Sequence, residues 1–210
     1  MRRLFILVIA ASTSLSGRAV PQTSALVRHR ITDHISFALP ADWIVGATFQ
    51  PGVQAGVDSL LLHSKDSVLQ ASLRSGVPQT LLVAHSPSGT LSVNLNITPS
   101  PGATASTFAH LSPDYLSART QTVCRLLGDT FAGLQGALDS CGPVASDTAG
   151  GRSIIVVPYR NHNASAAFVC WLAQYAAPDA ILTITLMARK PNGLKDRPLL
   201  AKIWRSLRLT

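Results

Sequence analysis

The sequence predicts a single α+β domain built on a central antiparallel β-sheet flanked by helices. Short segments in which apolar and polar residues alternate indicate strands, and longer segments with apolar residues at helical spacing indicate helices. The links between neighbouring strands are short, which favours antiparallel pairing. A chain of 210 residues makes one ordinary domain or at most two small ones, and no linker divides it. We therefore predict one α+β domain over residues 32–210.

The amino terminus has the layout of a secretory signal peptide. The charged start Met1-Arg2-Arg3 precedes an unbroken apolar run over residues 4–11, and Gly17 and Ala19 supply the small residues of a cleavage site. A membrane span needs about 20 apolar residues, so this run is too short to anchor the chain. We predict that residues 1–19 are a signal peptide cleaved after Ala19. The protein is then expected to be periplasmic or secreted, with no transmembrane segment in the mature chain.

The mature chain is predicted to begin with a flexible segment over residues 20–31, of which six are polar or charged and which contains Pro21. Residues 35–39 alternate apolar and small side chains before Pro40, which indicates the first strand. We further predict a strand at residues 58–62 and a short helix at residues 66–74.

A β-hairpin is predicted next. Residues 80–85 and 91–98 both alternate apolar and polar side chains, and the link Ser86-Pro87-Ser88-Gly89 contains turn residues. Residues 99–107 are rich in Pro, Gly, Ser, Thr and Ala without any period, so we expect a loop there.

A helix start follows this loop. The segment Ser112-Pro113-Asp114 offers an N-cap residue, a proline at the first helical position and an acid in the first turn. We predict a helix from there to about residue 127, with a stop at Gly128. Gly133 and Gly136 would each destabilise a helix that continues past this point by about 1 kcal/mol. A second helical segment is nevertheless predicted from the spacing of Phe131, Leu134 and Leu138.

The last third of the chain predicts three strands and a closing helix. Residues 154–159, 167–175 and 181–187 are rich in β-branched and aromatic side chains, and their short links favour a meander. Asp196 and Pro198 open the helix. Its apolar residues form a stripe wide enough to lie on a sheet: Leu199, Leu200, Ile203, Trp204 and Leu207.

Three segments of the chain, in their order along it, resemble the PsbP-like fold family, which includes the extrinsic photosystem II protein and many small exported bacterial proteins. They are residues 35–43 (ISFALPADW), residues 150–152 (GGR) before a strand, and residues 200–208 (LAKIWRSLR) after the last strand. The resemblance implies a PsbP-like α/β/α sandwich with helices on both faces of the sheet. It also implies a non-enzymatic binding, adaptor or assembly role, and it supplies no catalytic residue.

Charge composition limits the partners that we expect. The ten acidic residues are all Asp, which excludes motifs that require Glu. The formal net charge of +8 becomes +5 once Arg2, Arg3 and Arg18 are removed with the signal peptide. Most remaining basic residues are dispersed, so we expect no nucleic acid partner. The dense basic group near the carboxyl end favours an acidic protein or an anionic envelope component: Arg189, Lys190, Lys195, Arg197, Lys202, Arg205 and Arg208.

The three cysteines allow one disulfide bond in an exported protein. Cys124 and Cys141 flank the helical region, and a bond between them would stabilise the fold by about 3 kcal/mol. A bond between Cys141 and Cys170 is the alternative. Cys170 shares a strand face with Phe168 and Leu172, which favours a small buried core residue.

Local motifs for catalysis, cofactors or metals are missing from the sequence. The histidines do not pair at helical spacing, and the closest aspartates are eight residues apart. We therefore expect no cofactor and no metal, and favour an exported, non-catalytic binding or adaptor protein. The alternative is a small secreted hydrolase with scattered Ser, His and Asp residues, which requires one histidine to meet an Asp and a Ser in a pocket. Its candidate histidines are His63, His85, His110 and His162. No oligomeric state is indicated.

Overall fold

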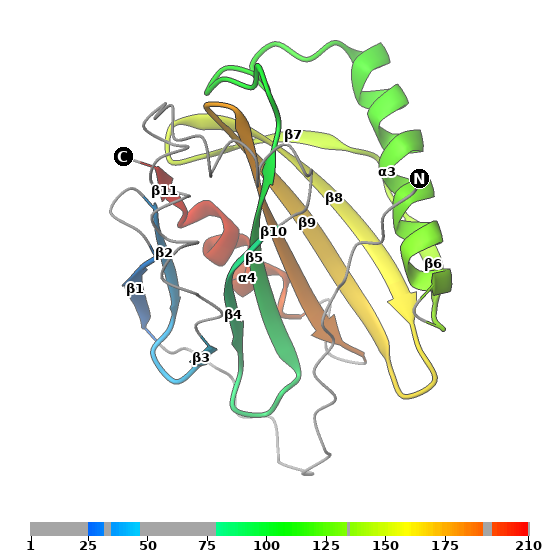
Figure 1. Cartoon of the computed structure of the whole chain (residues 1–210). Coiled ribbons are helices and arrows are strands. Elements are labelled where there is room, and N and C mark those ends of the chain that lie inside the picture. Colours follow the sequence, from blue (N-terminus) through cyan, green and yellow to red (C-terminus); the bar gives the residue numbers. More distant parts are fainter. Residues whose placement is uncertain (1–24, 32–34, 47–78, 134, 191–194, 210) are drawn as a thin grey trace.

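The structure, a computed structural model, describes residues 25–31, 35–46, 79–133, 135–190 and 195–209 (Figure 1). The expected signal peptide, the strand at residues 58–62 and the helix at residues 66–74 lie outside these residues. Within the described part, the protein is mostly antiparallel β-sheet with two α-helices, which confirms the α+β fold class at this level.

An eight-stranded antiparallel sheet forms the centre of the described residues. Its order is β3-β4-β5-β10-β9-β8-β6, and β7 pairs with the half of β8 that β6 does not reach. The hairpin prediction is confirmed by β4 and β5, and the meander prediction is confirmed by β8, β9 and β10. The strands are β3 (Ile44–Gly46), β4 (Gln79–His85), β5 (Leu91–Pro99), β6 (Ala137–Cys141), β7 (Ala145–Ala149), β8 (Arg152–His162), β9 (Ala167–Ala177) and β10 (Ala180–Arg189).

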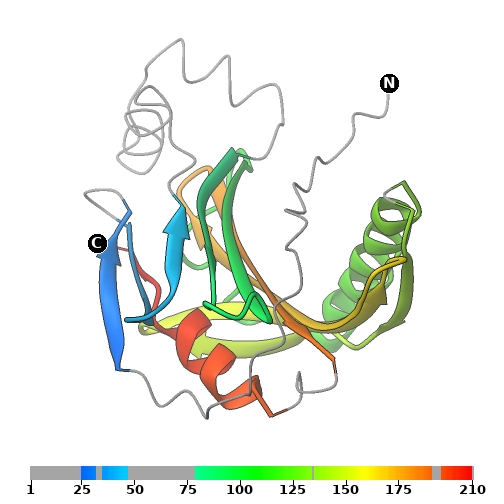
Figure 2. The ribbon, with the colours of Figure 1, turned by 90° about the horizontal axis from the view of Figure 1, so that it is seen from below.

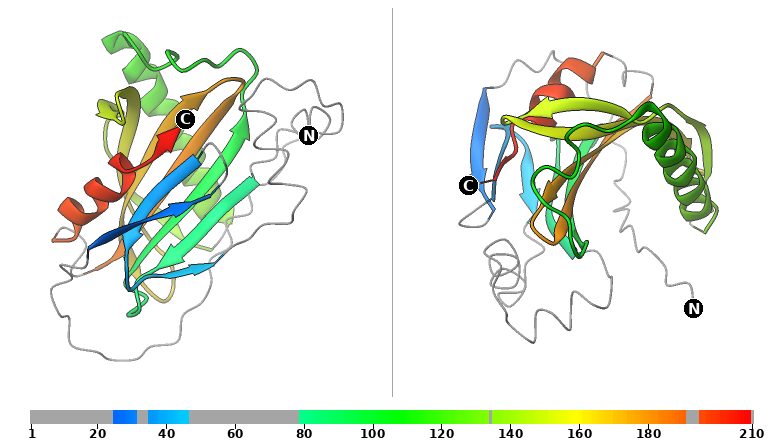
Figure 3. Two further views of the ribbon diagram at one scale, coloured as in Figure 1. Left: turned by 90° about the vertical axis from the view of Figure 1, so that its left-hand side faces the viewer. Right: turned by 90° about the horizontal axis from the view of Figure 1, so that it is seen from above.

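A second, three-stranded sheet has the order β1-β2-β11 (Figure 3). It joins β1 (Leu26–Arg30) and β2 (Ile35–Pro40) to β11 (Arg208–Leu209) at the end of the chain. The expectation of a flexible segment over residues 20–31 is therefore wrong for Leu26–Arg30. All five β1 residues pair with β2, whose apolar side chains are held in the core. The partner strand fixes β1 although its own side chains are largely exposed.

The two faces of the large sheet carry different helices (Figure 2). On β9, Trp171, Ala173 and Tyr175 belong to the main core together with the buried face of α4 (Arg197–Arg205). The alternate residue Cys170 packs on the other face, in a cluster with Phe131 of α3 (Pro113–Gly133). This alternation follows from the two-residue period of a strand. The packing of α4 on one face and of Cys170 on the other confirms the predicted apolar face of the last helix and the predicted core position of Cys170.

Helix α3 is longer than the sequence indicated. The Ser112 hydroxyl accepts a hydrogen bond from the Tyr115 N–H (3.2 Å), as expected of an N-cap, but the helix continues past Gly128 to Gly133. The last turn buries Phe131, whose ring lies 5.9 Å from that of Tyr159. This burial outweighs the local glycine cost of about 1 kcal/mol.

The second helical segment was predicted partly from Leu138, and that prediction is wrong. Leu138 lies in strand β6, opposite Asn161 of β8. The chain leaves the helix at Gln135, which has a φ of 57°, and the Gly136 N–H donates to the Phe131 carbonyl at 2.9 Å. These features are typical of a helix that ends with one residue in the left-handed backbone conformation. Phe131 thus belongs to α3 and Leu138 to β6, so the helical spacing of these two residues does not reflect a shared helix.

Candidate functional site

A groove of about 650 Å³ lies where helix α4 meets the three-stranded sheet. Figure 3 shows α4 beside β1, β2 and β11. Four cationic side chains line the groove, and no carboxylate lines it among the residues that the structure describes. We call it the basic groove; its residues are Leu26, Arg28, Ala38, Pro198, Ala201, Lys202, Arg205, Ser206 and Arg208.

The sheet register places the groove residues of β1 and β2 on one face. Arg28 lies opposite Ala38, and Leu26 lies two residues from Arg28, so these three share the outer face of the small sheet. The alternate β2 residues Phe37 and Leu39 face the core and are fully buried. The core residues of β2 thus fix the direction in which Arg28 points.

Arg28 is tied to the carboxyl end of α4. Its Nη1 atom lies 3.0 Å from the Ser206 carbonyl oxygen and 3.0 Å from the Ser36 hydroxyl, and it donates to both. The Ser206 hydroxyl in turn accepts a hydrogen bond from the Ala38 N–H at 2.8 Å. A cation is favourable here because the end of a helix carries partial negative charge. Arg28 therefore joins the two walls of the groove.

Tyr175 fixes the same end of α4 from the core side. Its hydroxyl donates to the Trp204 carbonyl. Burial raises the pKa of Tyr175, and the nearby Asp147 charge raises it further, so the phenol stays protonated and remains a donor. The position of the basic groove relative to the large sheet is therefore set by buried contacts.

Arg205 is neutralised within the fold. Its Nη2 and Nε atoms donate to Asp147 Oδ2 of β7 at 2.8 and 3.2 Å. The pKa of the Asp147 carboxyl is lowered: burial raises it, but the Thr148 N–H and the Arg205 guanidinium outweigh that effect. The pair is partly exposed, with 53% of the Arg205 side chain and 23% of the Asp147 side chain accessible to solvent.

The side chains of Lys202 and Arg208 are exposed in the groove. Neither side chain has a hydrogen-bond or ion-pair partner within the described residues. Arg208 lies against the β7–β8 turn, because a Cβ atom on Gly150 would come 2.9 Å from Arg208 Nη1. Gly150 also has a φ of 60°, which favours glycine. This turn contains the Gly-Gly-Arg segment on which the family resemblance partly rests, and it packs beside the groove.

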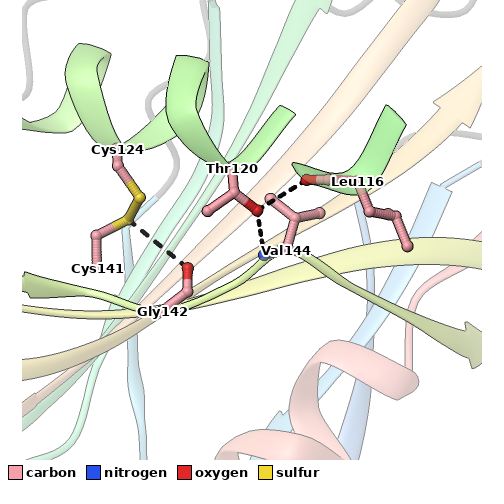
Figure 4. The surroundings of a disulfide bond; sticks show 6 residues. All are labelled: Leu116, Thr120, Cys124, Cys141, Gly142 and Val144. Atoms are coloured by element: carbon pink, nitrogen blue, oxygen red, sulfur yellow. Dashed lines mark hydrogen bonds between the residues drawn. A yellow bond between two sulfur atoms is a disulfide. The ribbon is translucent and has the colours of Figure 1, made fainter. Parts of the chain in front are cut away.

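Cys124 of α3 and Cys141 of β6 form a disulfide bond, with 5.7 Å between their Cα atoms (Figure 4). Of the two pairings left open by the sequence, this is the first. A hydrogen-bond relay reinforces the same junction: the Thr120 hydroxyl donates to the Leu116 carbonyl at 2.8 Å and accepts from the Val144 N–H at 2.9 Å. The bond lies on the α3 side of the large sheet and takes no part in the basic groove.

Cys170 is fully buried. Burial raises the pKa of its thiol to about 12, and its Sγ lies 3.2 Å from Asn161 Oδ1, to which it donates. A thiol with such a pKa is not a nucleophile at neutral pH.

The histidines of the hydrolase alternative are dispersed. His63 lies outside the described residues, and His110 is exposed. The His85 ring contacts the Ser86 carbonyl through Nδ1 at 3.0 Å. His162 Nδ1 does meet Asp139 Oδ1 at 2.5 Å, on the exposed β6–β8 edge. Within the described part of the chain, no serine hydroxyl bonds to this pair, so the structure brings together two members of a triad and not the third.

The described residues contain neither a cluster of metal ligands nor a helix able to span a membrane. No group of three or more His, Cys or Asp side chains is arranged to hold a metal ion there. No helix in the described part is long and apolar enough to cross a bilayer.

The sequence pointed to three of the four groove cations, because Lys202, Arg205 and Arg208 belong to the basic carboxyl-terminal group. It missed Arg28, which was placed in a loose start. The available signal was the order of residues 26–30 (LVRHR), in which Leu26, Arg28 and Arg30 share one strand face. A strand prediction at that point would have placed Arg28 on a sheet.

Comparison with known proteins identifies the fold. No family model matches the chain, and no curated protein matches its sequence. The solution structure of cyanobacterial PsbP (CyanoP) from Synechocystis sp. PCC 6803 matches with a TM-score of 0.52 and 12% sequence identity. The match covers 94% of this chain and 98% of CyanoP. The chain therefore has a PsbP-like fold, as the three sequence segments indicated.

A second solved structure, the PA94 protein of unknown function from Pseudomonas aeruginosa, matches with a TM-score of 0.37 and 11% identity. It covers 88% of this chain and 97% of PA94, but the TM-score is too low to indicate a common fold.

Proposed function

We propose that this protein is an exported, periplasmic or secreted, non-catalytic binding or adaptor protein that engages an anionic partner through the basic groove. The partner is an acidic protein or an anionic envelope component. The observation that carries the proposal is the groove itself: four cations line one depression, and only Arg205 among them has a carboxylate partner within the described residues.

Two features support export. The amino-terminal residues have the charge, apolar run and small residues of a signal peptide that ends at Ala19. The disulfide between Cys124 and Cys141 is of a kind that persists in oxidising compartments. The proposed fold of the domain is a separate point: the PsbP-like α/β/α sandwich agrees with α3 and α4 packing on opposite faces of the large sheet, and CyanoP has a similar fold.

The arrangement favours binding over chemistry. Arg28 and Arg205 are held by hydrogen bonds, while Lys202 and Arg208 remain available to an incoming anion. Exposed cations gathered in one depression attract anions from solution and orient them, and salt weakens that attraction. Arginine adds geometric selectivity, because its planar guanidinium binds carboxylate or phosphate through two parallel hydrogen bonds.

The test compares two double variants of equal net charge. We expect the purified protein to bind poly-aspartate or vesicles containing phosphatidylglycerol. It should not bind neutral phosphatidylcholine vesicles. Changing Lys202→Ala and Arg208→Ala together should weaken binding about five- to thirtyfold. The matched control changes Arg125→Ala and Arg160→Ala, which are exposed and lie on α3 and β8, away from the groove.

Surface plasmon resonance at two salt concentrations measures both pairs. The control should lose little affinity. Equal losses for both pairs would show that only net charge matters, and no binding to any anionic probe would overturn the proposal.

A further inference from the structure

Strand β1 is the outermost strand of the small sheet, and within the described residues it pairs only with β2. Its hydrogen bonds to β2 alternate along the strand. The Ala41 N–H donates to the Ala25 carbonyl at 3.1 Å, and the Ile31 N–H donates to the Ile35 carbonyl at 2.8 Å. Hydrogen-bonded pairs occur at every second residue of an antiparallel ladder. The backbone N–H and C=O groups of Val27 and His29 therefore also point toward β2. The backbone groups of Leu26 and Arg28 therefore point away from the sheet.

This edge carries apolar side chains as well as open backbone groups. Leu26 is 36% exposed and Val27 is 44% exposed. Leu26 and Arg28 line the basic groove, so the open backbone edge and the cationic depression adjoin each other. An exposed edge strand with apolar side chains is a template for pairing with another chain.

We propose that the partner of the basic groove is an acidic polypeptide segment that binds in extended form and adds to β1 as a further strand. This inference rests on the proposed function and names the class of partner. The outward N–H and C=O groups of Leu26 and Arg28 can pair with a backbone that carries complementary groups, which a polypeptide supplies and a lipid head group does not.

The register of such an added strand sets its side-chain pattern. Residues directly opposite each other in a ladder share a face. The segment therefore places an acidic residue opposite Arg28, which is one of the four cations of the groove, and apolar residues opposite Leu26 and Val27. The partner is recognised by an acidic and apolar pattern, and a uniformly acidic sequence satisfies only half of it.

The experiment separates backbone pairing from charge. The probe is a peptide of about eight residues, a common strand length, with Asp and Val in this pattern. An otherwise identical peptide carries N-methyl groups on the amides that would pair with β1. We expect the N-methylated peptide to bind the unchanged protein at least about tenfold more weakly, although its charge is the same.

A pair of protein variants tests the same point. Leu26→Pro removes an outward N–H and leaves the β1–β2 hydrogen bonds in place, because proline is tolerated on an edge strand at such a position. Leu26→Ala removes the same side chain and keeps the N–H. Binding of the unmodified peptide should fall about tenfold in the proline variant relative to the alanine variant, while vesicle binding stays equal in both.

Each outcome decides a different statement. Equal binding of both peptides, with the dependence on Lys202 and Arg208 retained, overturns strand addition and leaves the proposal that the basic groove binds anions intact. A preference for phosphatidylglycerol vesicles over the peptide also overturns it, in favour of a lipid partner. If the protein binds no anionic probe at all, the proposed function is overturned as well. If the Leu26→Pro variant does not fold, the N-methylated peptide against the unchanged protein still decides.

Discussion

At the scale of single residues, Asp147 sets how much positive charge the basic groove presents. Its carboxylate pairs with Arg205 at 2.8 Å and accepts a hydrogen bond from the Thr148 N–H at 2.7 Å. These contacts hold the pKa of Asp147 below its ordinary value, so the carboxylate stays ionised at neutral pH and masks one of the four groove cations.

The change Asp147→Asn should increase affinity for anionic probes several-fold, because it releases Arg205. It should lower the free energy of unfolding by at most about 1 kcal/mol, since the pair is partly exposed. Asp129→Asn makes the same change in net charge at an exposed position near the end of α3 and serves as the control. A similar gain in affinity for both variants would contradict a local role for Asp147.

The pH dependence of this pair has a definite sign. A carboxyl whose pKa is lowered by folding stabilises the protein above its unfolded pKa of about 3.9. That contribution is lost as the pH falls through the lower folded value. The stability difference between the native chain and the Asp147→Asn variant should therefore be constant from about pH 5 to 8 and shrink below the unfolded pKa. Urea unfolding at several pH values measures it.

At the scale of an element, two glycines in and after α3 have opposite roles. Gly128 lies inside the helix, and a Cβ atom there would meet nothing within 4 Å. Gly136 follows the helix, and a Cβ atom there would come 2.6 Å from the His162 carbonyl oxygen. The β6–β8 ladder fixes that oxygen, because the neighbouring Ala137 pairs with His162.

We expect Gly128→Ala to raise the free energy of unfolding by about 0.5–1 kcal/mol, since alanine has the higher helix propensity. Gly136→Ala should lower it by about 1–3 kcal/mol, because the backbone must shift to relieve the contact. Urea unfolding of both variants checks the pair. Stabilisation by Gly136→Ala would contradict the pairing of β6 with β8.

At the scale of the whole molecule, the disulfide links the helix of one sheet face to an outer strand of the large sheet. Closing a loop of this length stabilises the native state by about 3 kcal/mol, mainly through the unfolded chain. The double change Cys124→Ser and Cys141→Ser should therefore lower the free energy of unfolding by about that amount. A reducing agent should lower the stability of the native chain equally and leave the double variant unchanged.

Cys170 provides an internal control in the same experiment. Its buried thiol, with a pKa raised to about 12, should stay unreactive toward a thiol reagent until the protein unfolds. Rapid labelling of one thiol in the folded, non-reduced protein would contradict this position. Labelling of three thiols without reductant, after unfolding, would show that the Cys124–Cys141 bond is absent.

Much of the fold was accessible from sequence because its cause is local. Apolar side chains alternate along β5, β9 and β10 because one face of the sheet packs against the main core. The helix cap at Ser112 depends on a hydrogen bond to a residue only three positions away. The end of α3 was not accessible, because packing of Phe131 against Tyr159 carries the helix past Gly128. The short strands β3, β6, β7 and β11 were not predicted, since strands of two to five residues show too few alternations.

The sequence by itself determined the α+β class, the order of its main strands and helices, the layout of a signal peptide, and a carboxyl-terminal region rich in cations. Only the tertiary structure decided which cysteines pair and that Arg28 meets Ser206, 178 residues away, to join the two walls of the basic groove. The physical reason is the range of the interactions involved. Periodicity and caps depend on neighbours along the chain, whereas a groove between a strand and a distant helix depends on sheet register and on how both pack against a shared core.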